Sequence, residues 1–581
     1  MDISNLSIAT IRSLGIDTIN KANSGHPGMV LGSAPALYTL FNKELNIYNK
    51  EAEWINRDRF VLASGHASAL LYSMLHLTGF DVTIDDLKNF RQLNSRTPGH
   101  PEIEMTHGVD ASSGPLGQGI PMAAGMAMAE KFLASQYNKE NFDIIDHYTY
   151  VLCGDGDMQE GVTYEAASLA GHLSLGKLIV LYDANKVTLD GPLSMSFSEN
   201  VKKRYEACNW QVLEVKDGND INEIHKAIKK GKKEQFKPTL IIVNTVIGFG
   251  SANQGTNKVH GAPLGKEDGK NAKLSYGFDH DEFYVPEEVY EDFKKKTIKR
   301  GKSKFNKWNK LFNEYKEKYP TEAKQLEDAI AGKYSLNIDE LLKNYPVGHN
   351  DATRNTSLEV IQEVAKQNPT FLSGTADLAS STKTKIKDED DFSVENYNGR
   401  NLVFGIREFA MVAIMNGMTL HKGVKVSAGG FLVFSDYFKA AVRMACLMKL
   451  PIILPLSHDS IAVGEDGPTH EPIEHLAGLR AIPNLNVYRP ADARETQAAW
   501  YQAVTSKSTP TALVLTRQNL TVEEGTDFDK VSRGAYVVHE TAADFDTILL
   551  ASGSEVNLAV ASAKALESEG YKVRVVSVPS T

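Results

Sequence analysis

The chain has 581 residues, which is long for one domain and favours two or three. Its formal net charge of -10 argues against a general nucleic-acid binder, because such proteins usually carry a basic surface. Only three cysteines occur (Cys153, Cys208 and Cys446), which excludes a disulfide framework and suits a reducing compartment. No apolar run has the length of a membrane span, and no signal-peptide pattern stands at the N-terminus. We therefore expect a cytoplasmic protein that binds neither membranes nor nucleic acids.

The first half of the chain alternates short apolar runs with helical patterns. Residues 148–156, 176–185 and 238–248 are typical of buried strands, and residues 161–175 are typical of a helix. Strand, helix and strand at this spacing predict an α/β fold, a parallel sheet with helices on both faces. Ligands of such sheets bind beyond the carboxyl ends of the strands, where "GDG" (154–156) and "DANK" (183–186) both lie.

The composition changes near Val285, where a charged, helix-forming stretch begins. Strand patterns return later, and a strand-helix-strand pattern then closes the chain. One such unit is too little for an independent domain. The sequence thus predicts a multi-domain protein with an N-terminal domain (1–310), a charged helical connector (311–350), a second α/β domain (351–530) and the start of a third (531–581).

Asp155 and Asn185 stand 30 positions apart, at the ends of two predicted strands. A carboxylate, a carboxamide and a nearby backbone carbonyl are hard oxygen ligands, which suit Mg²⁺ or Ca²⁺. The glycines around Asp155 let the backbone approach a bulky anion, and the next helix can offer its N-terminus to phosphate oxygens. Taken alone, "GDG" is also compatible with an acidic surface turn. With the asparagine it is typical of the thiamine diphosphate signature, in which one divalent cation bridges the diphosphate to the protein.

Further short motifs follow one another in order: "ANSGHPG" (22–28), "SGHASALLY" (64–72), "RTPGHPE" (96–102), "SGPLGQG" (113–119), "GDGDMQEG" (154–161), "NKVHGAPLG" (257–265), "GTADLASS" (374–381), "GIREFAM" (405–411), "HDSIAVGEDGPTHEPIE" (458–474), "RPAD" (489–492) and "TRQNL" (516–520). Through them the chain resembles the transketolases over essentially its whole length. The resemblance implies reversible transfer of a two-carbon ketol unit from a ketose phosphate to an aldose phosphate, in the pentose phosphate pathway. It also implies a homodimer whose active sites are shared between subunits.

The resemblance implies that each site binds thiamine diphosphate as the cofactor and one divalent cation, Mg²⁺ or Ca²⁺. The metal would be held by Asp155, Asn185 and the carbonyl of Val187. Glu408, expected to be buried with a raised pKa, would hydrogen bond the aminopyrimidine ring of the cofactor; an ion pair with Arg407 is the alternative. The residues implied to bind thiamine diphosphate are His66, Gly114, Leu116, Gly156, Glu160, Asn185, His260, Asp377, Glu408, Phe431, Phe434 and Tyr437.

Phe434 would stack on the aminopyrimidine, with Phe431 and Tyr437 beside it; without the resemblance these rings would be ordinary core. The substrate is implied to contact His26, His100, His260, Arg354, Ser381, His458, Asp466, His470 and Arg517. Four of the histidines (His26, His100, His260 and His470) join Glu408 as the implied catalytic residues. For the phosphate contact, Ser380 competes with Ser381, and Arg354 could instead be a solubilising surface arginine.

Two departures from the family pattern stand out. Val187 occupies a position where isoleucine is common, an exchange that should not disturb a carbonyl ligand. The third domain stops early, so we expect the natural chain to continue past Thr581. Two other functions remain open: a 1-deoxyxylulose-5-phosphate synthase-like enzyme that uses pyruvate, and a non-catalytic homologue that retains only the fold.

Overall fold

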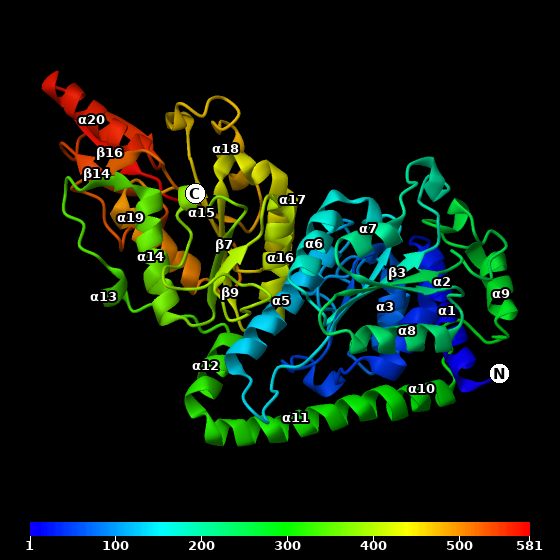
Figure 1. Ribbon diagram of the computed structural model, residues 1–581. Helices are drawn as coiled ribbons and strands as arrows, with labels where there is room; N and C mark the ends of the chain where they lie inside the picture. Colours follow the sequence, from blue (N-terminus) through cyan, green and yellow to red (C-terminus); the bar gives the residue numbers. More distant parts are fainter. The chain divides into compact units, whose positions relative to one another are not determined.

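The computed structural model describes residues 1–581 and divides the chain into two compact units, Met1–Lys324 and Gln325–Thr581 (Figure 1). The unit boundary falls inside α12 (Pro320–Ile330), within the predicted connector. Every helix is too short or too polar to traverse a lipid bilayer. The limits given above for the domains remain predictions, and the two units are described separately below.

The first unit is built on a five-stranded parallel sheet in the order β1-β2-β3-β5-β4. Its strands are β1 (Arg59–Leu62), β2 (Thr149–Gly154), β3 (Leu178–Ala184), β4 (Gln211–Val215) and β5 (Thr239–Asn244). β2, β3 and β5 lie where the sequence predicts them. β2 and β3 pair directly, with Gly154 opposite Asp183, so the residues that follow the two strands leave the sheet at the same edge.

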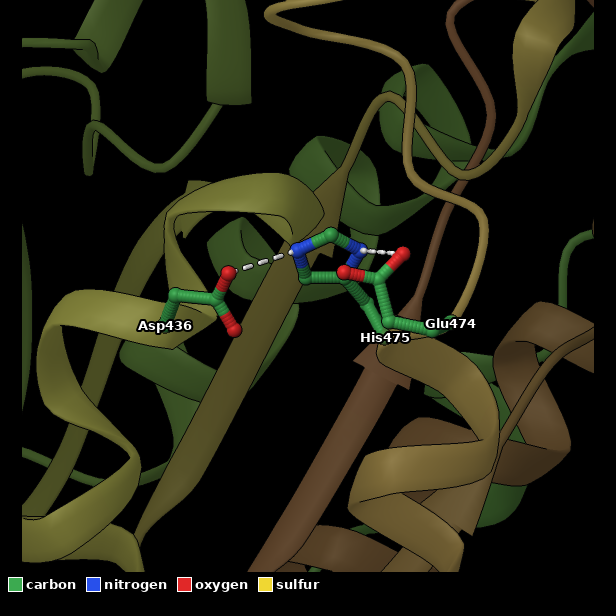
Figure 2. A group of neighbouring side chains, drawn as sticks. All are labelled: Asp436, Glu474 and His475. Carbon is green, nitrogen blue, oxygen red and sulfur yellow. Dashed lines mark hydrogen bonds and ion pairs between the residues drawn. The ribbon is translucent and has the colours of Figure 1, made fainter.

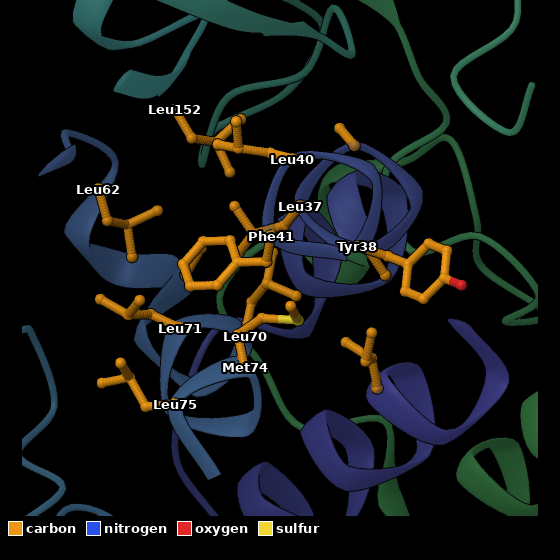
Figure 3. Close-up of a cluster of buried hydrophobic side chains, with 14 of the residues drawn as sticks. Leu37, Tyr38, Leu40, Phe41, Leu62, Leu70, Leu71, Met74, Leu75 and Leu152 are labelled. Atoms are coloured by element: carbon orange, nitrogen blue, oxygen red, sulfur yellow. The ribbon is translucent and has the colours of Figure 1, made fainter. Parts of the chain in front are cut away.

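Helices cover both faces of this sheet (Figure 1), which confirms the predicted α/β fold. Figure 3 shows one face: Leu62 and Leu152 point toward Leu37 of α2, toward Phe41 of the π-helical turn that follows it (Leu40–Glu44), and toward α3. α5 contacts β1 and β2 from the opposite face and packs against α6. The helices of this unit include α1 (Ile3–Ala22), α2 (Pro27–Thr39), α3 (Ser68–Leu77), α4 (Ile84–Lys88), α5 (Gly119–Tyr137), α6 (Gly161–His172), α7 (Val201–Ala207), α8 (Ile221–Lys233) and α9 (Gly265–Ser275).

The charged stretch after Val285 forms α10 (Glu287–Phe293), α11 (Lys299–Lys318) and the start of α12. α11 is anchored by its aromatic side chains, because the Trp308 indole donates to the carbonyl of Ile144 (2.8 Å) and the Tyr315 hydroxyl to that of Tyr137 (2.7 Å). Most of its lysine and glutamate side chains are exposed, whereas Arg300 donates to the carbonyls of Phe41 (2.7 Å), Asn42 (2.7 Å) and Leu45 (2.8 Å). The helix is therefore amphipathic and packs one side on the unit.

The second unit holds a six-stranded parallel sheet in the order β11-β12-β10-β9-β7-β8. Its strands are β7 (Phe371–Thr375), β8 (Asn401–Val403), β9 (Lys425–Phe431), β10 (Ile453–Ser457), β11 (Asn486–Tyr488) and β12 (Thr511–Val514). The accompanying helices are α13 (Ile338–Leu341), α14 (Thr353–Gln367), α15 (Ala379–Thr382), α16 (Glu408–His421), α17 (Ser435–Leu447), α18 (His475–Arg480) and α19 (Ala493–Thr505).

A short antiparallel pair joins the two ends of this second α/β segment. β6 (Asn350–Ala352) pairs with β13 (Asn519–Thr521), and Ala352 lies opposite Asn519. The hydroxyls of Thr353 and Thr516 lie 3.1 Å apart just inside the pair. The start of α14 and the segment after β12 are therefore fixed to each other.

The chain ends in a small sheet of order β14-β16-β15, from β14 (Tyr536–Glu540), β15 (Thr547–Ala551) and β16 (Val573–Ser577). β15 and β16 are parallel and are joined by α20 (Glu555–Ser568), as the sequence predicts, while β14 adds an antiparallel strand. β15 is not covered on both faces: Leu550 is 71% exposed. Val556 and Val560 of α20 pack with Val573 and Val575 in the core of this segment.

Glu495 of α19 is a buried carboxylate between the second sheet and the C-terminal segment. It accepts hydrogen bonds from the Tyr536 hydroxyl (2.6 Å) and the Ser577 hydroxyl (2.7 Å). Burial, reinforced by the negative charge of Asp492, raises the pKa of Glu495 from 4.5 to about 7. Between pH 4.5 and about pH 7, the folded chain therefore binds more protons at Glu495 than the unfolded chain does. The contribution of Glu495 to the free energy of unfolding is lost as pH rises through that window.

We expect the Glu495→Gln variant, which cannot ionise, to lose this part of the pH dependence. The difference in the free energy of unfolding between variant and wild type should change by on the order of 3 kcal/mol from pH 4 to pH 8. Denaturant unfolding at several pH values measures it. Glu569→Gln, at an exposed position, is the control and should run parallel to wild type. A Glu495→Gln profile that also runs parallel to wild type would contradict the burial effect.

Candidate active site

Asp155 lies directly beyond the end of β2 and is 3% exposed. Its carboxylate accepts a hydrogen bond from the backbone N–H of Lys186 (2.7 Å) and another from the hydroxyl of Tyr182. Burial raises the pKa of Asp155, and these two donors oppose the rise. The "GDG" motif is therefore not a solvated surface turn. Its first carboxylate faces inward, toward the residues that follow β3.

Asn185 and Val187 stand beside Asp155 after β3. The Asn185 side-chain NH₂ donates to Asp183 (2.7 Å), which leaves the amide oxygen to accept from the backbone N–H of Val187 (3.0 Å). Burial raises the pKa of Asp183 to about 6, and Thr245 also donates to it. Asp183 thus orients the amide so that its oxygen lies on the side of Val187. The structure brings together the three predicted metal ligands.

Asp157, the second aspartate of the motif, has a structural position. It is fully buried and accepts from the Ser64 hydroxyl (2.6 Å), the Gly117 N–H (2.9 Å) and the Gly154 N–H (3.0 Å). Three donors satisfy a carboxylate well without a metal. Asp157 therefore ties the end of β2 to two other loops, a role that its position in the sequence did not reveal.

The glycines of "SGPLGQG" allow these loops to approach one another closely. Gly117 has a φ of +81°, and a Cβ added there would lie 2.4 Å from the Cβ of Glu160. A Cβ on Gly156 would meet Leu116 at 2.8 Å, and one on Gly65 would meet the Gly114 nitrogen at 2.7 Å. Gly117, with its positive φ, and Gly65, which meets backbone, leave no room for a larger residue. The predicted cofactor residues Gly114, Leu116, Gly156 and Glu160 consequently share one loop cluster, next to His66.

Four histidines from four separate segments converge in the first unit. The ring of His26 lies 5.2 Å from that of His66, 6.3 Å from that of His100 and 6.0 Å from that of His260, measured between centroids. The rings of His66 and His260 stack at 5.3 Å. The four histidines that the resemblance assigns to this domain thus form one group.

Burial keeps these imidazoles neutral. It lowers the pKa of His26 to about 4 and that of His66 to about 3, and it also lowers the pKa of His100 and of His260. The neighbouring Arg91 adds to the effect at His26. Neutral imidazoles carry one N–H donor and one acceptor each at pH 7. The four histidines can therefore bind hydroxyls and pass protons without first being deprotonated.

Arg91 is a member of this group that the sequence did not reveal. Its guanidinium donates to the Ser24 hydroxyl (3.0 Å) and lies 3.3 Å from the Nδ1 of His26. It precedes the "RTPGHPE" motif in the chain, and proximity to that motif was the one available signal. Its contact with His26 joins residues 65 positions apart, which only the fold brings together.

In the second unit, a pocket of about 440 Å³ opens at the carboxyl end of the sheet; we call it the two-arginine pocket. Its lining residues are Arg354, Ser380, Ser381, Phe431, His458, Asp466, His470 and Arg517. Arg354 donates to the carbonyl of Ser381 (2.9 Å), and Arg517 donates to that of Val463 (2.8 Å). The predicted phosphate contacts, Asp466 and His470 therefore lie together. Both Ser380 and Ser381 line the pocket, so the choice between them stays open.

A row of aromatic rings begins at Phe431 in the wall of this pocket and runs outward from it. Phe431 lies 3.8 Å from the ring of His458 and 5.7 Å from that of Phe434, nearly parallel to the latter. Phe434 in turn contacts the rings of Tyr437 (6.0 Å) and His470 (5.4 Å). Tyr437 is 65% exposed, so the row ends at the surface of the unit. A flat heterocycle could stack on its outer rings.

Glu408 differs from the expectation of burial. It is the first residue of α16 and is half-buried, because the neighbouring Val403 and Ile406 are 54% and 77% exposed instead of covering it. Asp377 is exposed, with a φ of +62° just after β7. Neither residue lines the two-arginine pocket. Within the chain alone, Glu408 is therefore only partly buried.

Asp436, Glu474 and His475 form the cluster in Figure 2. The buried His475 ring lies between the two exposed carboxylates: its Nε2 is 3.1 Å from Asp436, and its Nδ1 is 3.9 Å from Glu474. The carboxylates face opposite ring nitrogens, whereas a metal ion binds one imidazole nitrogen along its lone pair. We therefore interpret the cluster as a histidine held between two acids, which fastens α18 to α17.

Unpartnered polar atoms mark where a ligand would fit. The Nδ1 of His260, the hydroxyl of Ser113 and the side-chain oxygen of Gln118 are buried without a hydrogen-bond partner. All three belong to the loops around the histidine group and the glycine cluster. Buried polar groups are normally paired. A diphosphate would supply acceptors for the Ser113 hydroxyl and the His260 ring, and a divalent cation would supply a charge for the oxygen ligands of Asp155 and Asn185.

Comparisons with known families assign three parts of the chain. Residues 3–335 match the family described as the thiamine diphosphate binding domain of transketolase, residues 350–523 the transketolase pyrimidine binding domain, and residues 534–581 the transketolase-like C-terminal domain. The chain is 58% identical over 584 residues to a probable transketolase of Streptococcus pneumoniae, covering 100% of this chain and 88% of that one. It is 56% identical over 580 residues to the transketolase of Bacillus subtilis, covering 99% and 87%.

Solved structures agree. A transketolase from Pichia stipitis in complex with sedoheptulose 7-phosphate superposes with a TM-score of 0.97 at 46% identity, over 100% of this chain and 86% of that one. The transketolase of Campylobacter jejuni gives 0.92 at 42% identity, over 100% and 88%. The three matched domains, the relatives at more than half identity and the shared fold together show that the chain belongs to the transketolase family of thiamine diphosphate-dependent enzymes.

Proposed function

We propose that the chain transfers a two-carbon ketol unit from a ketose phosphate, such as xylulose 5-phosphate, to an aldose phosphate, such as ribose 5-phosphate. The observation that carries this proposal is the two-arginine pocket, where two guanidiniums, two histidines and an aspartate converge beside an aromatic wall. Guanidiniums suit a phosphate, and the aspartate suits a sugar hydroxyl. Transketolases of Pichia stipitis have been solved with xylulose 5-phosphate and with fructose 6-phosphate, which supports this substrate class.

Residues of the first unit would hold the charged end of the cofactor. We assign the divalent cation, Mg²⁺ or Ca²⁺, to Asp155, Asn185 and the Val187 carbonyl, and the diphosphate to the glycine cluster with His66 and His260. Thiamine diphosphate, when bound, supplies a nucleophilic carbon and an electron sink for carbon–carbon cleavage. The neutral His26 and His100 would donate to and accept from sugar hydroxyls as protons move.

Residues of the second unit would hold the aminopyrimidine end and the substrate phosphate. We assign stacking to Phe434, with Phe431 and Tyr437 beside it, and the ring hydrogen bond to Glu408. Asp377 stays a proposed cofactor contact on resemblance alone. His470 and Asp466 would contact hydroxyls near the reacting carbon, and the residues around Arg354 and Arg517 would bind the phosphate.

A transfer assay tests the proposed function. Purified protein should form sedoheptulose 7-phosphate from xylulose 5-phosphate plus ribose 5-phosphate, and the rate should depend on added thiamine diphosphate and a divalent cation. Pyruvate plus glyceraldehyde 3-phosphate is the control pair and should give no product. Product from the pyruvate pair alone would favour a synthase, and product from neither pair would favour a non-catalytic homologue.

We further propose a homodimer with shared sites, in which the first unit of one chain completes the second unit of its partner. The half-buried Glu408 supports this, because Val403 and Ile406, which are near it in the chain, expose apolar side chains that a partner could cover. Cover by a partner chain would desolvate the carboxyl group as the sequence led us to expect. We also propose that the protein acts in the cytoplasm, because its three cysteines are all free, as is usual in a reducing compartment.

Mixing two inactive variants should restore activity if sites are shared. A hybrid of Asp155→Ala and Glu408→Gln chains has one site with both changes and one with neither. Random exchange of equal amounts should therefore recover about a quarter of the wild-type rate, since half the dimers are hybrids. Each variant alone, carried through the same exchange, is the control. Verified hybrids without activity would place each site within a single chain.

A further inference from the structure

His458, in the two-arginine pocket, has a strained backbone. Its φ is +63°, in the left-handed region that non-glycine residues rarely adopt, and it is 3% exposed. Such a conformation persists only where its surroundings hold it. The ring is held by Phe431 and by the Ser457 hydroxyl, 2.9 Å from its Nδ1. The backbone at His458 is held by the next residue in the chain, Asp459.

The side chain of Asp459 is completely buried. One carboxylate oxygen accepts from the Arg489 guanidinium (2.6 and 3.2 Å) and from the Ser554 hydroxyl (2.9 Å). The other accepts from the side chain of Gln518 (3.2 Å), the residue after Arg517. Asp459 thus links the chain at His458 to the chain at Arg517, two sides of the same pocket.

Arg489, at the end of β11, connects Asp459 to the C-terminal segment. Its guanidinium donates to the carbonyl of Ser552 (2.9 Å) and to Glu555, in the turn between β15 and α20. Gly553 in this turn has a φ of +59°, and a Cβ there would lie 2.4 Å from the Arg489 Cγ. The turn is therefore packed against the arginine too closely for any larger residue.

No residue after Arg517 lines the two-arginine pocket. The β15–α20 turn can therefore influence the pocket only through residues that lie between the two. The ion pair of Arg489 with Asp459 is the charged contact among these residues. A guanidinium bonded to the buried carboxylate of Asp459 on one side and to the exposed carboxylate of Glu555 on the other is a rigid joint, since its planar fork fixes both partners. We propose that Arg489 is a positioning residue, through which the β15–α20 turn holds His458 and Arg517 in place for the substrate phosphate. This inference rests on the proposed function for the identity of the ligand.

The test compares two donors in the transfer reaction, xylulose 5-phosphate and xylulose, with the dimeric, cofactor-loaded enzyme. Arg489→Met should raise the KM for xylulose 5-phosphate about tenfold or more with little change in kcat, because ground-state and transition-state binding are lost equally. The KM for xylulose should stay unchanged. Arg480→Met is the matched control: Arg480 contacts the hydroxyl of Ser552 in the same turn but bonds to neither carboxylate of the joint. It should leave both KM values unchanged.

Because Arg489→Met leaves two acids without their partner, Glu555→Gln and Asp459→Asn serve as milder variants in case it does not fold. Each should raise the KM for xylulose 5-phosphate selectively, about threefold or more. Titration calorimetry with inorganic phosphate should show the same weakening without turnover.

Equal losses with both donors, or no loss, in folded variants would overturn the positioning role of Arg489. A wild-type enzyme that shows no preference for the phosphorylated donor would instead contradict the proposed function. The two failures are therefore distinguishable.

Discussion

Glu408→Gln is expected to lower kcat at least 100-fold while leaving the fold and the melting temperature unchanged. The proposed role of Glu408 is to share a proton with a ring nitrogen of the cofactor, which an amide cannot do. Loss of one such preorganised group costs about 10²–10³ in kcat. The half-buried position at the start of α16 tolerates glutamine, since glutamine has nearly the same shape as glutamate.

Steady-state kinetics and thermal unfolding measure the two halves of this expectation. Glu363→Gln is the matched control, because Glu363 is also half-buried on a helix of the second unit, away from the two-arginine pocket. It should keep wild-type kcat. Calorimetry should show that Glu408→Gln still binds thiamine diphosphate within about tenfold of wild type. A kcat within twofold of wild type would mean that Glu408 does not activate the cofactor.

Asp155→Asn should abolish the metal-dependent part of cofactor binding and raise the dissociation constant of thiamine diphosphate about 100-fold or more. Metal and diphosphate hold each other, so the loss of one charged ligand weakens both. We prefer asparagine to alanine here, because its oxygen can still accept from Tyr182 or the Lys186 N–H. Alanine would leave a buried hydroxyl unpaired at a cost of about 1–3 kcal/mol.

Titration calorimetry with and without Mg²⁺ decides this prediction. Wild type treated with a chelator should resemble the variant, while Asp190→Asn, an exposed position in the loop after β3, should bind as wild type does. Cofactor affinity in Asp155→Asn that is unchanged and indifferent to chelator would remove Asp155 from the metal site. It would also show that the "GDG" motif has another partner.

In the first sheet, the sequence predicted the strands that carry a continuous apolar run. β2 and β3 are buried on both faces, which gives such a run, and β5 is buried at four of its six positions. β1 has only four residues, and the first four side chains of β4, at the sheet edge, are all partly or fully exposed, so neither run is distinctive. A short strand or an edge strand can be identified mainly from the strand with which it pairs in the structure.

The candidate site shows the same limit. Short motifs pointed to Asp155, Asn185 and the histidines, because the motifs and their order can be read directly from the sequence. The roles of Asp157 and Asp459 were not predictable, since each depends on donors distant in sequence: Ser64 is 93 positions from Asp157, and Ser554 is 95 from Asp459. The burial of Glu408 was overestimated because adjacent apolar residues, such as Ile406, are exposed in the single chain.

The pairing of β6 with β13 means that the second α/β segment begins and ends at one place. Opposed residues of such a pair lie about 5 Å apart. A segment with adjacent ends can be moved between proteins as one insert, or its ends can be joined and new termini opened in a surface loop. The two-arginine pocket lies within this segment and is therefore portable in principle, so grafting experiments could exchange it between relatives that supply their own β15–α20 turn.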